Sequence, residues 1–192
     1  ECVLTPDSFD RPELYFVVTD CASDDKPAVL KQVLDSQLPA RLGAESKSFS
    51  APQGEDSHCG LVFCPHVNGD FGVDSVARLL KEQGITVARY SGAPPKSEQG
   101  GTRAWSENKR KVERAFRDNK VRVLACTKAF GMGIDKRNVR FTAHYGMPPS
   151  IEAYYQEAGR AARDRDPDNP AWCFVLLSDE FTKQHGDLLS PA

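Results

Sequence analysis

The sequence predicts an α/β sandwich around a largely parallel sheet of about six strands. Short apolar runs alternate along the chain with longer amphipathic segments, which is the order expected of strand–helix–strand units. Several of the runs are almost continuously apolar, as in strands that are covered on both faces. A length of 192 residues and a hydrophobic content of 40% suit one well-buried core.

The elements follow from local patterns. Runs rich in β-branched and aromatic residues predict six strands, at residues 14–19, 60–64, 87–90, 121–126, 140–145 and 172–177. Helical periodicity predicts four helices, at residues 27–37, 73–83, 103–119 and 150–162. Residues 42–57, rich in Ser, Gly and Glu, and residues 91–101, with two Pro and two Gly, are expected to be surface loops, the first one mobile. Because ligands collect at the carboxyl ends of parallel strands, we expect the chemistry just after each strand.

Charge is unevenly distributed along the chain. Residues 1–60 carry 5 basic and 11 acidic side chains, a net charge of −6, whereas residues 81–140 carry 15 basic and 6 acidic ones, a net charge of +9. The basic middle predicts a local contact with a polyanion, although part of it is also explained by a solvated helix face. No apolar run reaches membrane-spanning length.

The six cysteines form no C-x-x-C pair, which indicates free thiols in a reducing cytosol. The group His58, Cys59, Cys64 and His66 has the residue types of a metal site. The odd separation of Cys59 and Cys64 along a strand places them on opposite faces, which argues against joint binding of a metal.

Two segments point to anionic oxygen. Gln156, Gly159, Arg160 and Arg163 have the spacing of one face of the helix predicted at 150–162, and arginine binds phosphate through two donors at once. There are two alternatives. Either the face is simply solvated, or the arginines form ion pairs with the downstream carboxylates Asp164, Asp166 and Asp168. Residues 127–135, after a predicted strand, combine a hydroxyl, two glycines and a carboxylate, which suits either a phosphate contact or a tight strand-to-helix turn.

Four segments occur in order along the second half of the chain: Ala-Phe-Gly-Met-Gly-Ile-Asp-Lys at 129–136, Val-Arg-Phe at 139–141, His-Tyr at 144–145 and Tyr-Tyr-Gln-Glu-Ala-Gly-Arg-Ala-Ala-Arg-Asp at 154–164. Together they resemble the RecQ family of superfamily 2 DNA helicases. Residues 8–14, Ser-Phe-Asp-Arg-Pro-Glu-Leu, are similar to the segment by which that family enters its second motor lobe. The resemblance implies an entry segment at 1–13 from a missing first lobe, and a RecA-like three-layer helicase C-terminal domain at 14–192.

By this resemblance the chain is half of an ATP-driven motor whose ATP and Mg²⁺ are bound mainly by the first lobe. Arg160 and Arg163 then reach the γ-phosphate, Gln156 couples the nucleotide to DNA, and Gly133 and Asp135 lie near the ribose or the lobe interface. Six residues are expected to lie at the backbone of single-stranded or forked DNA: His66, Asn68, Ser91, Gly92, Thr127 and Lys128. The resemblance also implies 3'-to-5' unwinding, DNA repair and recombination, and a cytoplasmic location with the bacterial nucleoid.

The sequence departs from the family pattern at three places, one of which is the stretch 63–72, longer here than the usual form. Ala162 stands where the family usually has glycine, which we expect to be harmless because alanine is the better helix former. Tyr90-Ser91-Gly92 replaces a His-containing turn. No G-x-x-x-x-G-K-[ST] motif is present, so the chain alone is expected to be inactive, with weak, salt-dependent DNA binding. Two rival functions remain open, the lobe of an RNA helicase and a stand-alone nucleic-acid-binding module without catalysis.

Overall fold

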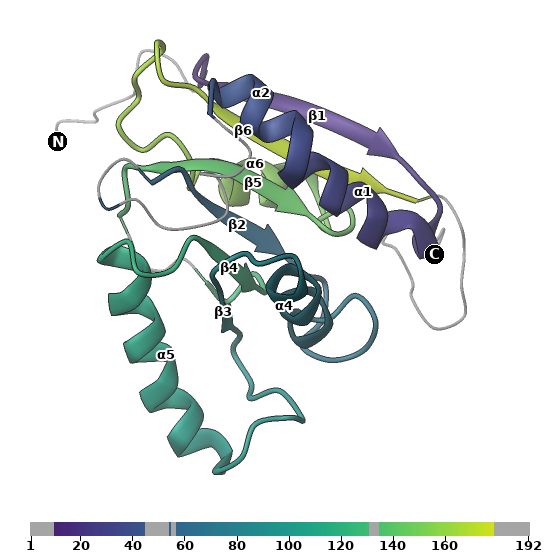
Figure 1. Cartoon of the computed structure of the whole chain (residues 1–192), viewed down its shortest axis with the longest axis vertical. Helices are drawn as coiled ribbons and strands as arrows, with labels where there is room; N and C mark the ends of the chain where they lie inside the picture. The colour runs from purple at the N-terminus through teal and green to yellow at the C-terminus, as the bar shows by residue number, and fades with distance from the viewer. Residues whose placement is uncertain (1–9, 45–53, 55–56, 131–134, 179–192) are drawn as a thin grey trace, which may run out of the picture.

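A computed structural model describes residues 10–44, 54, 57–130 and 135–178. Within these residues six parallel strands form one sheet in the order β1-β6-β5-β2-β4-β3 (Figure 1). The strands are β1 (Leu14–Asp20), β2 (Cys59–Phe63), β3 (Val87–Tyr90), β4 (Val123–Cys126), β5 (Val139–His144) and β6 (Ala171–Leu177). All six predicted strands are confirmed, with ends that agree within two residues.

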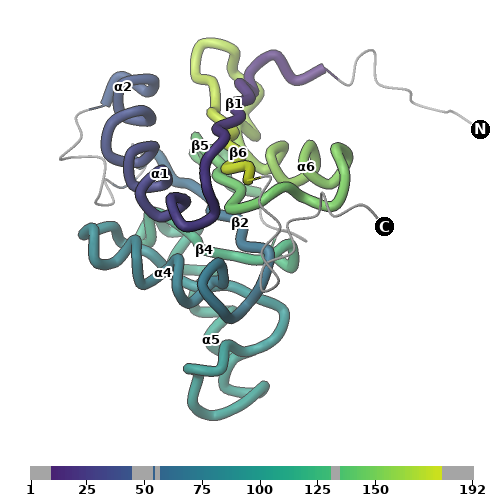
Figure 2. Tube along the Cα trace, turned by 90° about the vertical axis from the view of Figure 1, so that its right-hand side faces the viewer, coloured from purple at the N-terminus to yellow at the C-terminus, as the bar shows by residue number. Residues whose placement is uncertain are grey.

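Helices cover both faces of the sheet. One helical run joins α1 (Lys26–Gln32), the π-helical η2 (Val33–Gln37) and α2 (Leu38–Leu42), after a short 3-10 turn η1 (Ser23–Asp25). It lies with α4 (Val73–Glu82) on one face, and α5 (Gly101–Arg117) and α6 (Ile151–Ala158) lie on the other (Figures 1 and 2). Each face has its own cluster of buried apolar side chains, so the predicted three-layer sandwich is confirmed.

The central strands are buried throughout, and their side chains alternate between the two layers. In β2, Leu61 packs toward α5 and α6, whereas Val62 packs toward α1 and α4. Cys59 and Cys64 also fall into different layers, as their spacing predicts. Among the described residues no group of three or more His, Cys, Asp or Glu side chains is placed to hold a metal ion.

Helix α6 is shorter than predicted. It begins at Ser150, whose Oγ accepts a hydrogen bond from the Ala153 N–H at 3.1 Å, and it ends at Ala158 instead of Ala162. The chain then turns: Ala162 has a left-handed φ of 47°, and its N–H donates to the Val139 carbonyl at 3.0 Å. That tertiary hydrogen bond uses the donor that would have closed the next helical turn.

The predicted helical face is therefore wrong. Gln156 lies on α6, but Gly159 and Arg160 lie in the turn after it and Arg163 lies beyond the left-handed Ala162. Most of the loop predicted at 42–57, and Gly133, lie outside the described residues. In the part of the chain that the structure describes, no helix combines the length and apolar character needed to cross a membrane.

Candidate nucleic-acid interface and arginine turn

A cavity of about 860 Å³ lies at the carboxyl edge of the sheet, where β2, β3, β4 and β5 end. The segments that follow these four strands line it, as the general rule for parallel sheets predicts. Five of the six residues predicted to contact DNA are among its walls: His66, Asn68, Gly92, Thr127 and Lys128. We call this hollow the carboxyl-edge cavity.

The turn after β4 presents Thr127 and Lys128 to the carboxyl-edge cavity. The Thr127 N–H donates to the Tyr90 carbonyl at 3.1 Å, and the Thr127 carbonyl accepts from the Phe130 N–H at 3.0 Å. These bonds fix the backbone of the turn. The Thr127 side chain is half-buried and Lys128 is exposed, so a hydroxyl and an ammonium group stand beside each other at the cavity wall.

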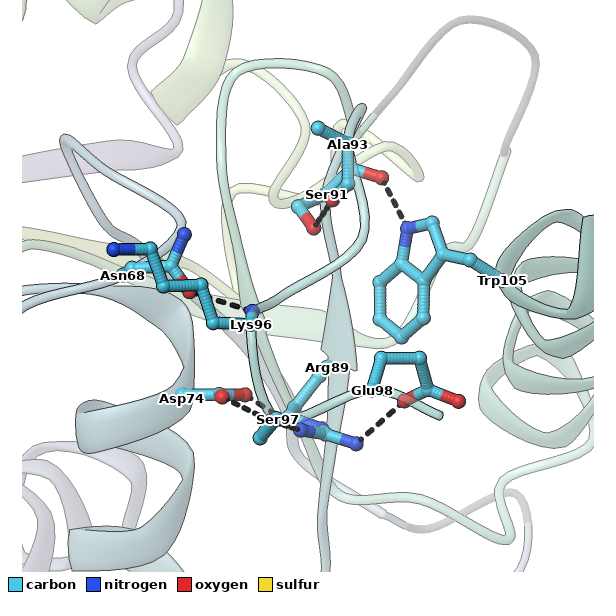
Figure 3. Close-up of polar contacts among 9 residues, drawn as sticks. All are labelled: Asn68, Asp74, Arg89, Ser91, Ala93, Lys96, Ser97, Glu98 and Trp105. Carbon is cyan, nitrogen blue, oxygen red and sulfur yellow. Dashed lines mark hydrogen bonds and ion pairs between the residues drawn. The ribbon is translucent and has the colours of Figure 1, made fainter. Parts of the chain in front are cut away.

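Arg89, the penultimate residue of β3, holds the loop 91–100 in place (Figure 3). Its guanidinium donates to Asp74 on α4 at 2.5 Å, to the Ser97 hydroxyl at 3.0 Å and to Glu98 at 3.1 Å. The Ser97 hydroxyl in turn donates to Asp74. One arginine therefore joins the loop to the sheet and to a helix.

Ser91 differs from the prediction. It is fully buried, its hydroxyl donates to the Ala93 carbonyl at 2.6 Å, and its own carbonyl accepts from the Trp105 indole at 3.0 Å (Figure 3). Ser91 does not line the carboxyl-edge cavity, because its side chain shapes the turn from inside. The neighbouring Gly92 and Ala93 are exposed and do line it.

The loops after β2 and β3 are coupled to each other. The Lys96 N–H donates to the Asn68 side-chain carbonyl at 2.8 Å, and both residues line the carboxyl-edge cavity (Figure 3). The amide of Asn68 thus positions a lysine. Sequence reasoning missed Lys96 because no local pattern distinguishes it from any other lysine in a Pro-rich loop.

His144 and Glu157 are two further wall residues that sequence reasoning did not select. His144 ends β5, it is 1% exposed, and its ring stacks on Phe63 with the ring centroids 4.8 Å apart. Its Nε2 lies 3.0 Å from a Glu157 carboxylate oxygen on α6. Its position at a strand end is a signal that could have identified His144, whereas Glu157 follows no such rule.

The two predicted nucleotide arginines lie on a turn at the opposite end of β5. We call residues 159–163 the arginine turn; it is bonded to Val139, the first residue of β5. Burial of the Arg160 guanidinium, followed by the positive charge of Arg163, lowers the pKa of Arg160 below its ordinary value. Arg163 is exposed. Because two like charges interact here, an anion bound between them would be favoured.

Asp135 is exposed and lies a few residues before the start of β5. The arginine turn is bonded to the first residue of the same strand. Lys136, the neighbour of Asp135, is buried and donates to the Arg117 carbonyl at 3.4 Å. Gln156 is exposed on α6. Asp135 and the backbone of the arginine turn thus lie near the start of β5, whereas the Arg160 side chain interacts with Cys126, the last residue of β4, and with Glu157 of the cavity wall.

The carboxylates that follow the arginine turn have other partners. Asp164 accepts from the Arg140 guanidinium, with one contact at 3.0 Å, and Arg140 also donates to the Asn169 carbonyl at 2.7 Å. The Asp166 side chain accepts from the Asp168 N–H at 3.0 Å. These contacts stabilise the loop that leads to β6.

Comparison with known proteins places these features in a family. The profile described as "Helicase conserved C-terminal domain" matches residues 46–165. The ATP-dependent DNA helicase RecQ of Pasteurella multocida is 38% identical over 136 residues, which cover 66% of this chain and 20% of that protein. The ATP-dependent DNA helicase RecQ of Haemophilus influenzae is 38% identical over 160 residues, 83% of this chain and 20% of that protein.

A plant relative, the ATP-dependent DNA helicase Q-like SIM of Arabidopsis thaliana, is 47% identical over 90 residues, 47% of this chain and 9% of that protein. The chain thus spans about a fifth or less of the length of these curated relatives. A solved structure of "Mss116p DEAD-box helicase domain 2 bound to an RNA duplex" covers 87% of this chain and 55% of that chain, with a TM-score of 0.60 and 16% identity. At that identity the likeness shows the fold alone, which is RecA-like. The chain belongs to the helicase C-terminal domain family, in its RecQ branch.

Proposed function

We propose that this chain is the second motor lobe of an ATP-dependent DNA helicase that unwinds forked DNA in the 3'-to-5' direction. In this proposal the carboxyl-edge cavity contacts the backbone of single-stranded DNA, and Arg160 and Arg163 serve ATP held with Mg²⁺ mainly by a first lobe. The observation that carries the proposal is a cavity lined by a hydroxyl and lysines in the same domain as a turn with two mutually repelling arginines, because a motor lobe must bind both a nucleic-acid backbone and a nucleotide.

The carboxyl-edge cavity has the chemistry that a nucleic-acid backbone requires. The Thr127 hydroxyl and the ammonium groups of Lys96 and Lys128 come from three different positions of its wall and can bind successive phosphates. Exposed Gly92 lets a phosphate approach the main chain closely. Contacts of this kind read no sequence, and they weaken steeply with salt.

The arginine turn suits a nucleotide supplied from outside the chain. Arg163 is exposed and can extend toward a neighbouring lobe, and an anion would offset its repulsion with Arg160. ATP supplies the phosphoryl group, and the two guanidiniums stabilise the charge that develops on its oxygens during transfer. Without a phosphate-binding motif of its own, the isolated chain is expected to hydrolyse no ATP.

The test is DNA-stimulated ATP hydrolysis by the full parent protein. Arg163→Ala should lower kcat on the order of 10³-fold and change the KM for ATP by only a few-fold, since the contact forms mainly in the transition state. Arg117→Ala removes an exposed arginine at the end of α5 and serves as the control with normal turnover. Unchanged turnover in Arg163→Ala would refute the arginine role.

The same protein tests the DNA contact. Thr127→Ala should weaken single-stranded DNA binding across a salt series, whereas Thr127→Ser retains the hydroxyl and should bind normally. Equal affinity of both variants would exclude the contact. Loss of DNA affinity without loss of ATP turnover in Arg163→Ala would favour the stand-alone binding module, and a preference for RNA over DNA of the same sequence would favour the RNA helicase lobe.

A further inference from the structure

Arg11 connects the segment before β1 to the arginine turn, across some 150 positions of sequence. Its side chain is 13% exposed. Nη1 donates to the Gly159 carbonyl at 3.4 Å, and Nη2 donates to the carbonyls of Ala161 at 3.1 Å and Ala162 at 3.0 Å. One guanidinium therefore serves three carbonyls of a four-residue stretch that also contains Arg160.

These contacts replace the helix that the sequence pattern predicts. Helix α6 ends at Ala158, and its last carbonyls accept from N–H groups of the turn, among them those of Gly159, Arg160 and Ala161. The carbonyls beyond the helix are bound instead by the guanidinium of Arg11. Ala162, whose carbonyl it holds, has the left-handed φ of 47° that lets the chain leave the helical path before Arg163.

The position of Arg11 is itself fixed from the opposite side. Its Nε donates to the carboxylate of Glu13, which is 3% exposed. The Glu13 main-chain carbonyl accepts from the Ala171 N–H at 2.9 Å, at the start of β6. The planar guanidinium thus uses one edge for the carboxylate and the other for the turn, which an ammonium group cannot reproduce.

We propose that Arg11 is a positioning residue for the nucleotide site, because it fixes the backbone of the arginine turn and so presents Arg160 and Arg163 in one geometry. The inference rests on the proposed function, in which these two arginines serve ATP. It adds that the segment before β1 sets the precision of that site. Misplacement of a catalytic group by about 1 Å can cost about 100-fold in rate, so a loosened turn should be visible in turnover.

The experiment compares Arg11→Lys with Glu13→Gln in the full parent protein. Arg11→Lys keeps a positive charge beside Glu13 but loses the fork that spans three carbonyls. It should lower kcat at least about tenfold, leave DNA affinity unchanged, and accelerate amide hydrogen exchange in a peptide covering residues 159–165. Glu13→Gln keeps an acceptor for Arg11 Nε and removes only the charge, so it should lower stability and cost less kcat than Arg11→Lys.

Three results would overturn the inference. The first is normal turnover, or normal exchange at 159–165, in Arg11→Lys. If Arg163→Ala still abolishes turnover, this result leaves the proposed function intact. The second is an equal loss of kcat in Glu13→Gln without faster exchange at 159–165, which makes the effect one of general stability. The third is normal turnover in Arg163→Ala, which removes the proposed function as well.

In the Arg163→Ala background, Arg11→Lys should cause a smaller further loss of kcat than in the wild type, since the two residues act through the same turn.

Discussion

Ala162 occupies the backbone conformation that accounts for a preference for glycine at its position. A left-handed φ places Cβ close to the following carbonyl and costs an alanine about 1–2 kcal/mol. The expectation that alanine is harmless there is wrong in its reasoning, because helix propensity applies only to a helical backbone. Burial of the methyl group offsets part of this cost, by about 0.8 kcal/mol.

Glycine substitution separates the backbone effect from the loss of the methyl group. Ala161 is as completely buried as Ala162 but has no positive φ. Ala161→Gly should therefore lower the free energy of unfolding by about 1.5 kcal/mol, whereas Ala162→Gly should leave it within about 1 kcal/mol of the wild type. Urea unfolding of the 192-residue chain measures both. Equal losses at the two positions would show that the left-handed conformation stores no strain.

At the level of elements, the strands were predictable and the end of α6 was not. Every residue of β2 and β4 is buried, and these two strands are apolar runs that can be read locally. The end of α6 depends on partners far away in sequence, Arg11 and Val139, which no local periodicity contains. An alanine-rich stretch with helical propensity therefore forms a turn, because tertiary hydrogen bonds outweigh a preference of a few tenths of a kcal/mol per residue.

The cavity shows the same division between local and distant information. The rule that ligands bind at the carboxyl ends of strands correctly predicts the location of five of the six expected DNA residues, which line one cavity. It failed for Ser91, whose side chain turns inward to Ala93, since sequence does not reveal which way a turn residue points. It also missed Lys96 and Glu157, which line the cavity and contact Asn68 and His144.

Arg89 is the cation that joins the loop 91–100 to α4. Arg89 separates the carboxylates of Asp74 and Glu98, whose side chains are 23% and 18% exposed. Without the guanidinium these two partly buried charges would repel each other. The loop would then move away from α4 and take Gly92 and Lys96 out of the cavity wall.

Arg89→Met should consequently weaken single-stranded DNA binding at least about threefold more than Arg103→Met does. Arg103→Met is the control, because it removes the same charge from a side chain that is 94% exposed on α5. Fluorescence anisotropy in the full parent protein measures the two affinities, and limited proteolysis at 91–100 reports the loop. The KM for ATP should not change in either variant. If the two variants bind DNA equally, the loop does not need its anchor.

Over the whole molecule, the sheet order brings the basic stretch of the sequence together in space. Residues 81–140, with a net charge of +9, contribute β3, β4 and α5, and β3 and β4 are neighbours at one side of the sheet (Figure 1). Lys96 and Lys128, which line the carboxyl-edge cavity, belong to this stretch. A nearly neutral protein can thus attract a polyanion to this side of the molecule.

Stability should fall in acid, because two carboxylates are held ionised by arginines in the folded state. Burial opposes ionisation of Glu13, but the hydrogen bond from Arg11 holds the pKa of Glu13 below its usual 4.5. The hydrogen bond from Arg140 likewise lowers the pKa of Asp164 below its usual 3.8. A lowered pKa stabilises the folded state at a pH above the unfolded value, and this contribution disappears as the pH falls through the folded value.

The contribution of Glu13 can be isolated by urea unfolding of the 192-residue chain between pH 7 and pH 3. At pH 7, Glu13→Gln should be less stable than the wild type by roughly 1–2 kcal/mol, the usual size for a hydrogen bond to a charged group. The difference between the two proteins should begin to shrink near pH 4.5, where the unfolded carboxylate takes up its proton, and shrink further as the pH falls through the lower pKa of the folded state. Glu107→Gln, at a carboxylate that is 61% exposed on α5, should show little difference at any pH. A gap for Glu13→Gln that stays constant with pH would mean that the ion pair with Arg11, and with it the electrostatic anchoring of the arginine turn, contributes nothing to the folded state.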